Sequence, residues 1–179
     1  MGKNYYAATF VSLDRPGIVA EVAKVLYENG FNIEDSSSTL LRGFFSMILI
    51  ISHENLFTPD EIKSMFLNSS KKLGLSISVK YVESLQEPLK NGKTFVISIY
   101  GSDKPGIVYK VTKFLADNNI NIVDLQTKVA GKKDKPLYVM VLEINLSEDC
   151  DETWISSLKA ISDELGTDIN IRQIETYEF

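Results

Sequence analysis

Cysteine and histidine are almost missing from this sequence of 179 residues, which has one of each, Cys150 and His53. One cysteine cannot form an intrachain disulfide or a thiolate-based zinc or iron–sulfur site, and one histidine cannot form a multi-histidine metal centre. A Ser/His/Asp or Cys/His triad would have to use His53 itself. We therefore expect neither a metal nor a cofactor.

Positive charge and long apolar segments are also scarce. With 19 Lys and Arg against 24 Asp and Glu, the net charge is -5, which disfavours a surface that neutralises phosphates. The longest apolar run, residues 47–51, is too short to span a bilayer, and the first residues lack the apolar stretch of a signal peptide. These absences predict a cytoplasmic protein that binds neither membranes nor, directly, nucleic acid.

An internal repeat organises the sequence. The hexapeptide Asp-Arg-Pro-Gly-Ile-Val at residues 14–19 recurs as Asp-Lys-Pro-Gly-Ile-Val at residues 103–108, and the same spacing pairs Asn32 with Asn121. Extra residues in the second copy fit its polar stretch 131–136. A charged connector with proline and glycine separates the copies. We expect two domains joined by a linker, at residues 5–83, 84–92 (the linker) and 93–179.

Each copy switches between strand-like and helix-like hydrophobic patterns. In the first copy, alternation typical of strands occurs at residues 6–13, 33–41, 45–52 and 76–82. Five apolar residues form the stripe of a first helix: Ile18, Val19, Val22, Val25 and Leu26. A second, continuous helix is expected to begin at Thr58 and to carry the stripe Ile62, Phe66 and Leu73. The second copy repeats this pattern, with Trp154 in the core.

The element order of each copy is therefore β-α-β-β-α-β. This order is that of the ferredoxin-like fold, a four-stranded antiparallel sheet with two helices on one face. The predicted fold class is α+β, with two such units.

The turn before each first helix is the most informative motif. Pro16 and Gly17 are expected in the first helical turn, where a missing N–H is harmless and the absent Cβ lets a small molecule approach the backbone. The unpaired N–H groups and the positive end of the helix dipole favour a carboxylate. The acidic residues Asp14 and Asp103 can accept an ammonium group. This combination matches the two charges of a free α-amino acid, although the same residues are also ordinary helix-start chemistry.

These motifs resemble the ACT domain, in which a similar turn opens the first helix and Asn-Ile opens the second strand. ACT domains are ferredoxin-like regulatory modules that commonly bind amino acids, and the resemblance covers both copies. A chain of two such modules is similar to the glycine cleavage system transcriptional repressor group. The resemblance places ligand between the first loop of one module and the second strand of its neighbour. The matching positions are Asp14, Gly17 and Ile18 with Asn121, and Asp103, Gly106 and Ile107 with Asn32.

Serine-responsive members of this family have a histidine where Asp14 and Asp103 stand, which argues against serine as the ligand. Asn32 and Asn121 have an alternative explanation, because asparagine after the end of a helix is often only a turn residue. The polar residues 34–38 face either a wet groove or solvent at an edge strand. We expect His53 in an exposed loop.

Other function classes have weaker support. An RNA-recognition module shares the element order, and Arg42 and Gly43 begin like its third-strand motif, but the second copy lacks that motif. No sequence motif supports an enzyme whose chemistry would use only carboxylates. The main alternative is a structural pairing module without ligand. We expect a non-enzymatic regulator that binds a small amino acid, modulates a protein partner such as a transcription factor, and forms homo-oligomers through sheet edges or helices.

Overall fold

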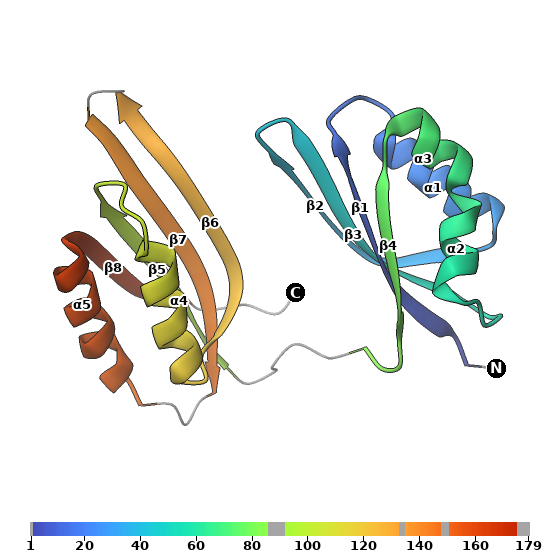
Figure 1. Cartoon of the computed structure of the whole chain (residues 1–179). Helices are drawn as coiled ribbons and strands as arrows, with labels where there is room; N and C mark the ends of the chain where they lie inside the picture. Colours follow the sequence, from blue (N-terminus) through green and yellow to red (C-terminus); the bar gives the residue numbers. More distant parts are fainter. Residues whose placement is uncertain (1, 86–91, 133–134, 148–150, 175–179) are drawn as a thin grey trace. The chain divides into compact units, whose positions relative to one another are not determined.

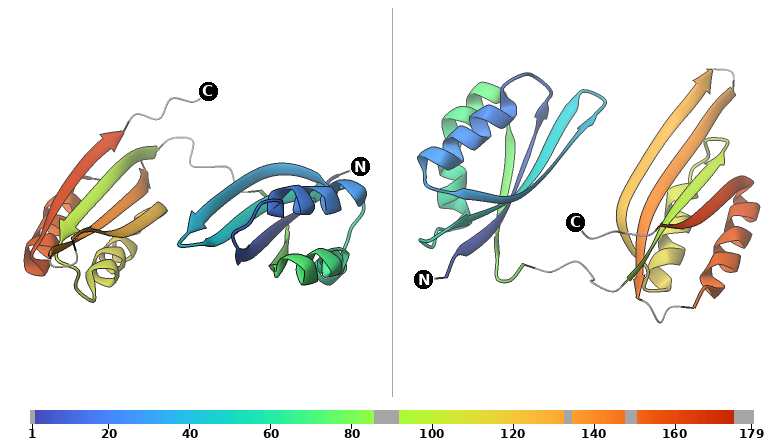
Figure 2. Two further views of the ribbon diagram at one scale, coloured as in Figure 1. Left: turned by 90° about the horizontal axis from the view of Figure 1, so that it is seen from above. Right: turned by 180° about the vertical axis from the view of Figure 1, so that it is seen from behind.

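The computed structural model describes residues 2–85, 92–132, 135–147 and 151–174. The chain divides into two compact units, residues 1–86 and 87–179. Each unit has one four-stranded antiparallel sheet with its helices on one face (Figures 1 and 2). The predicted fold class, two ferredoxin-like units, is confirmed. Cys150 lies outside the described residues.

The first unit contains seven elements. They are β1 (Asn4–Leu13), α1 (Ile18–Glu28), β2 (Asn32–Leu41), β3 (Phe44–His53), α2 (Pro59–Met65), α3 (Leu67–Leu73) and β4 (Ser76–Val82). The strand order is β2-β3-β1-β4, so β2 and β4 are the edges of the sheet.

The second unit contains six elements. They are β5 (Gly92–Gly101), α4 (Ile107–Asp117), β6 (Asn121–Lys132), β7 (Lys135–Ser147), α5 (Thr153–Leu165) and β8 (Thr167–Ile174). The strand order β6-β7-β5-β8 repeats that of the first unit. The extra residues of the second copy lengthen the β6–β7 hairpin.

Alternation in the central strand places one face of each sheet in a core. In β1, Tyr6, Ala8 and Phe10 have no exposed surface. They pack with the α1 residues Ile18 and Val22 in the first core. The second unit has its own core, in which Trp154 is 4% exposed, as the sequence predicts. Burial of these side chains is the main stabilisation of each unit.

The predicted stripe of the first helix is too wide. Val19 is 52% exposed and its counterpart Val108 is 39% exposed. Both lie in the first helical turn, beside the loop and outside the cores.

The prediction of a single second helix in the first unit is also wrong, because the structure has two helices, α2 and α3, in its place. Phe66 separates α2 from α3 with φ -93° and ψ 3°. Its ring is fully buried, and its centroid lies 5.1 Å from that of Phe10. We attribute the break to this packing, which places the ring in the core between two short helices.

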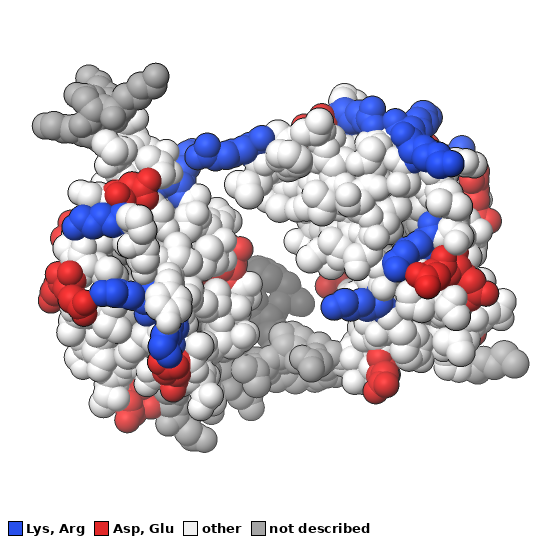
Figure 3. All heavy atoms as spheres, viewed as in Figure 1, with Lys and Arg blue, Asp and Glu red and all other residues white. Residues whose placement is uncertain are grey.

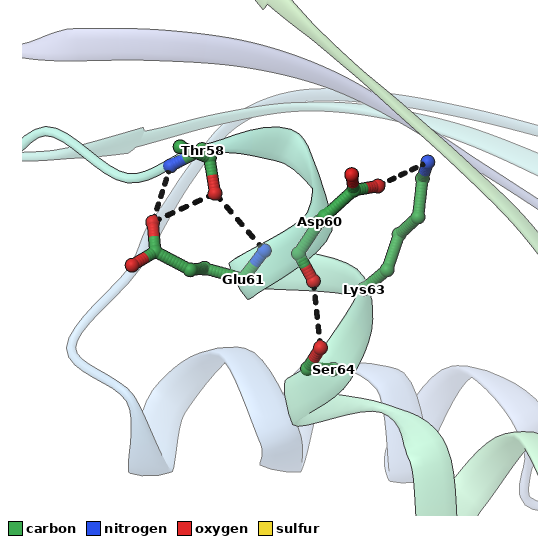
Figure 4. A network of polar contacts seen from close by, with 5 residues as sticks. All are labelled: Thr58, Asp60, Glu61, Lys63 and Ser64. Atoms are coloured by element: carbon green, nitrogen blue, oxygen red, sulfur yellow. Dashed lines mark hydrogen bonds and ion pairs between the residues drawn. The ribbon is translucent and has the colours of Figure 1, made fainter.

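The predicted start of this helix at Thr58 is present as a capping box (Figure 4). The Glu61 N–H donates to Thr58 Oγ1 at 3.2 Å, and the Thr58 N–H donates to Glu61 Oε2 at 2.6 Å. The two side-chain oxygens thus satisfy two otherwise unpaired backbone N–H groups. The Thr58 backbone N–H, and then its hydroxyl, lower the pKa of Glu61.

Candidate ligand-binding site

A left-handed glycine begins the first helix of each unit. Gly17 has φ 95° and ψ -5° before α1, and Gly106 has φ 98° and ψ -10° before α4. Neither helix has a side-chain cap at its N-terminus. The first backbone bonds are those from the Glu21 N–H to the Gly17 carbonyl oxygen at 3.0 Å and from the Lys110 N–H to that of Gly106 at 2.9 Å. The N–H groups of the first turn are therefore not used within the helix.

This geometry corrects the expectation that Pro16 and Gly17 lie within the first helical turn. Pro16 precedes the helix, and Gly17 is its N-cap. A Cβ at either glycine would meet nothing within 4 Å, so the positive φ, and not crowding, favours glycine there. The same open space leaves the backbone accessible to a small molecule.

The loop of the first unit borders a shallow hollow of about 530 Å³. Its lining includes Asp14, Gly17, Val19 and Phe45. Among the described residues, no side chain forms a hydrogen bond or an ion pair with the carboxylate of Asp14 or of Asp103. Ile18 as a whole residue is 2% exposed and Ile107 is 1% exposed, so neither side chain is available to a ligand.

The basic residue of each repeated motif has a structural contact that the sequence does not reveal. Arg15 Nη2 donates to the Lys72 carbonyl oxygen at 2.9 Å, and Lys104 Nζ donates to that of Leu165 at 3.4 Å. Both acceptors lie in the last turn of the unit's final helix. Cations are favourable at this end of a helix. The signal in the sequence was a basic residue at the same place in both copies.

Asn32 and Asn121 begin β2 and β6, the edge strands that follow the first helices. Within a unit, the loop glycine and this asparagine lie at opposite ends of an 11-residue helix, which is about 16 Å long. The two halves of the predicted site therefore do not meet within either unit.

A charged network surrounds Asn32 in the first unit. Glu34 Oε1 accepts from Lys3 Nζ at 2.8 Å and from Ser52 Oγ at 2.5 Å. Hydrogen bonds from Lys3, then Ser52, then Asn32 lower the pKa of Glu34 to about 2. A hollow of about 270 Å³, lined in part by Lys3, Asn32 and Ser52, lies beside this network. Sequence reasoning missed it, because Lys3 precedes β1 while its partners lie in β2 and β3.

His53 lies at the rim of the same hollow, which corrects the prediction of an exposed loop. It is the half-buried last residue of β3. Its ring centroid is 4.9 Å from those of Phe31 and Phe57. His53 Nδ1 accepts from the Asn55 N–H at 2.8 Å. The histidine is thus part of an aromatic cluster.

Comparison with known proteins agrees with this architecture. Profiles described as ACT domain match residues 8–80 and 95–149. A UPF0237 protein of Methanococcus maripaludis is 35% identical over 85 residues, which cover 47% of this chain and 91% of that protein. The chain belongs to the ACT domain family, as a tandem of two modules. The glycine cleavage system transcriptional repressor of Escherichia coli is 27% identical over 127 residues, which cover 70% of this chain and 65% of the repressor.

A solved structure has a similar fold. The crystal structure of an unknown protein from Galdieria sulphuraria has a TM-score of 0.81 and 25% identity, and covers 97% of this chain and 100% of that chain. The similarity therefore includes both modules of this chain.

The edge strand β2 of the first ACT module is exposed along its whole length. Residues 34–38 therefore lie on an exposed edge, but Ser36 and Ser38 also line a hollow of about 170 Å³ together with Val19 and Val22 of α1, so both predicted alternatives apply to parts of this segment. On the sheet face away from the helices, an apolar patch lies near the β2–β3 hairpin, and the face over these strands carries few charged side chains (Figure 3). We call it the outer patch; its members are Val11, Leu13, Leu41, Phe44 and Ile48, which are 37–67% exposed.

Two other kinds of site have no support in the part of the chain that the structure describes. There, no group of three or more His, Cys, Asp or Glu side chains could hold a metal ion. No described helix is long and apolar enough to cross a membrane.

Proposed function

We propose that this tandem ACT protein is a non-enzymatic regulator that binds a small α-amino acid at its helix-start loops. The observation that carries the proposal is the pair of uncapped helix N-termini, each beginning at an open left-handed glycine and each preceded by an aspartate. Because both modules have this backbone geometry, we do not attribute it to chance.

Each charge of the ligand has a matching group. The free N–H groups of the first turn, beginning with that of Ile18, would donate to the ligand's carboxylate, and the helix dipole favours this negative charge. The carboxylate of Asp14 would accept from the ammonium group. The second module would use Ile107 and Asp103 in the same way.

We further propose that the ligand joins two modules, as it commonly does in the ACT family. Asn32 and Asn121 would then act from the neighbouring module, because each is a helix length away from the loop of its own. A ligand that contacts both modules favours the arrangement in which they meet. The exposed β2 edge offers unpaired backbone groups for contact with another module or a second copy.

The proposed protein partner is a component of transcriptional control, by likeness to the E. coli repressor. The outer patch supports contact with a protein, because its exposed side chains are apolar. A net charge of -5 makes direct duplex binding unfavourable. A gel shift at about 150 mM salt should therefore need a second protein, whereas a specific shift by this chain alone would contradict the proposal.

Equilibrium dialysis of the chain against the twenty amino acids tests the ligand, with a thermal-shift screen at about 10 mM as a second measurement. Ligand at about 100 times its Kd adds about 2.7 kcal/mol of stability. For a chain of this size, that raises the Tm of the transition containing the site by roughly 5–11 °C. If no amino acid binds or moves Tm beyond 1 °C or so, the structural pairing module without ligand becomes the better explanation.

A further inference from the structure

The aromatic residue near the loop differs between the two modules. Phe45 pairs with Ser12 near the end of β1, and Tyr138 pairs with Gly101 at the end of β5. The two aromatics therefore occupy the same position in their modules. Phe45 lines the loop hollow of the first module, which places Tyr138 at the corresponding loop of the second.

The Tyr138 hydroxyl makes no hydrogen bond of good geometry among the described residues. Tyr138 is 8% exposed and its hydroxyl oxygen is buried, and the Thr127 hydroxyl nearby gives it at most a poorly aligned contact. Buried hydroxyls nearly always have a partner, and one without a partner destabilises the protein. Phe45 imposes no such penalty on the first module.

Two neighbouring residues influence this hydroxyl. Burial raises the pKa of Tyr138 above its usual value, the Asp103 carboxylate raises it further, and the Thr127 hydroxyl opposes the rise. Asp103 is the loop residue that would accept the ligand's ammonium group. The pairing of Tyr138 with Gly101, two residues before Asp103, places this tyrosine at the loop end of the sheet, near the acid of the proposed site.

We propose that Tyr138 is a ligand-recognising residue of the second module, where its hydroxyl oxygen and the Asp103 carboxylate together accept hydrogen bonds from the ammonium group of an α-amino acid. This rests on the proposed function and deepens it. The second loop then binds amino acids more tightly than the first, in which Phe45 offers no acceptor. Since the hydroxyl is covered in the free protein, the loop side chains must shift as the ligand enters.

The test titrates the full ¹⁵N-labelled chain with each of the twenty amino acids and follows the amide signals of Gly17 and Gly106, which report the two loops separately. We expect an amino acid that moves the Gly106 signal at lower concentration than the Gly17 signal. In Tyr138→Phe the affinity at Gly106 should fall by about tenfold or more, with the Gly17 titration unchanged. Acetate carries only the carboxylate of the amino acid and methylamine only its ammonium group. Of these two, only methylamine should bind Tyr138→Phe more weakly than it binds the original chain.

Stability of the free protein separates recognition from a structural role. Because Tyr138→Phe removes a buried hydroxyl that makes no hydrogen bond of good geometry, its Tm should equal or exceed that of the original chain, whereas a lower Tm or failure to fold would overturn the inference. The matched variant Phe45→Tyr should leave the Gly106 titration unchanged. Unchanged affinity at Gly106 in Tyr138→Phe would overturn this inference and leave the proposed function intact. If no amino acid moves either glycine signal, both are overturned.

Discussion

Arg15 Nη2 donates a hydrogen bond of 2.9 Å to the Lys72 carbonyl oxygen, and so connects the loop before α1 to the last turn of α3. Lys104 reaches the carbonyl oxygen of Leu165 in the second module. The basic residue of the repeated motif thus holds the loop against the final helix of its module, while the acidic residue beside it stays available. Adjacent residues of one motif thus divide into a structural role for the basic residue and the proposed ligand-binding role for the acid.

Arg15→Ala should destabilise the first module by about 1 kcal/mol, because a hydrogen bond at a helix end is lost. Arg15→Lys should retain part of this stability, as the second module uses lysine. Urea denaturation measures the difference. The control is Lys24→Ala, which removes only an exposed ion pair of 3.8 Å with Glu28 and should change stability by about 0.5 kcal/mol or less. Equal effects of Arg15→Ala and Lys24→Ala would contradict the role assigned to Arg15.

Gly17→Ala should destabilise the protein by about 1–2 kcal/mol, because an L-residue resists the φ of 95° at this N-cap. Open space around the missing Cβ means that no clash adds to this value. Gly2→Ala is the matched control, since Gly2 also has open space but no positive φ. Thermal or urea unfolding of the two variants should separate strain from crowding; similar stability of both would show that the loop tolerates a side chain.

Glu34 should make stability depend on pH in acid. Its pKa is about 2 in the folded protein against a usual value of 4.5, so the carboxylate stabilises the folded state above about pH 4.5. This contribution should disappear as the pH falls from there toward about 2. Glu34→Gln should therefore lower the urea midpoint at pH 7 and match the original chain near pH 2. If the difference in urea midpoint between Glu34→Gln and the original chain stayed constant over this range, the Lys3–Glu34 pair would not be the cause of the low pKa of Glu34.

Asp14→Asn and Asp103→Asn should abolish or strongly weaken amino-acid binding at their own loops. Neither carboxylate has a hydrogen-bond partner among the described residues, so stability should change by no more than about 0.5 kcal/mol. Equilibrium dialysis and urea denaturation of the same samples measure both effects. Glu28→Gln, which removes a charge at the far end of α1, should bind normally. Loss of folding together with binding would point instead to a helix-start role for the acids.

Much of the fold could be predicted from the sequence because its signals are local. Alternation in β1 and β5 and the repeated turn predict the element order and most core residues, such as Tyr6 and Trp154. The break at Phe66 could not be predicted, since it depends on a ring packed against Phe10 from another strand. The position of His53 likewise depends on Phe31 and Phe57, which no periodic pattern connects to it.

The duplicated β-α-β-β-α-β order, with a Pro-Gly turn and an aspartate before each first helix, follows from the amino-acid sequence without any knowledge of the packing. These features depend on neighbouring residues and on periods of two or about 3.6 residues. The tertiary structure alone decided that the glycines are left-handed caps, that Arg15 is tied to Lys72, and that the loop and the asparagine of one module lie a helix length apart. Such relations depend on how distant segments pack, and a linear pattern does not contain them.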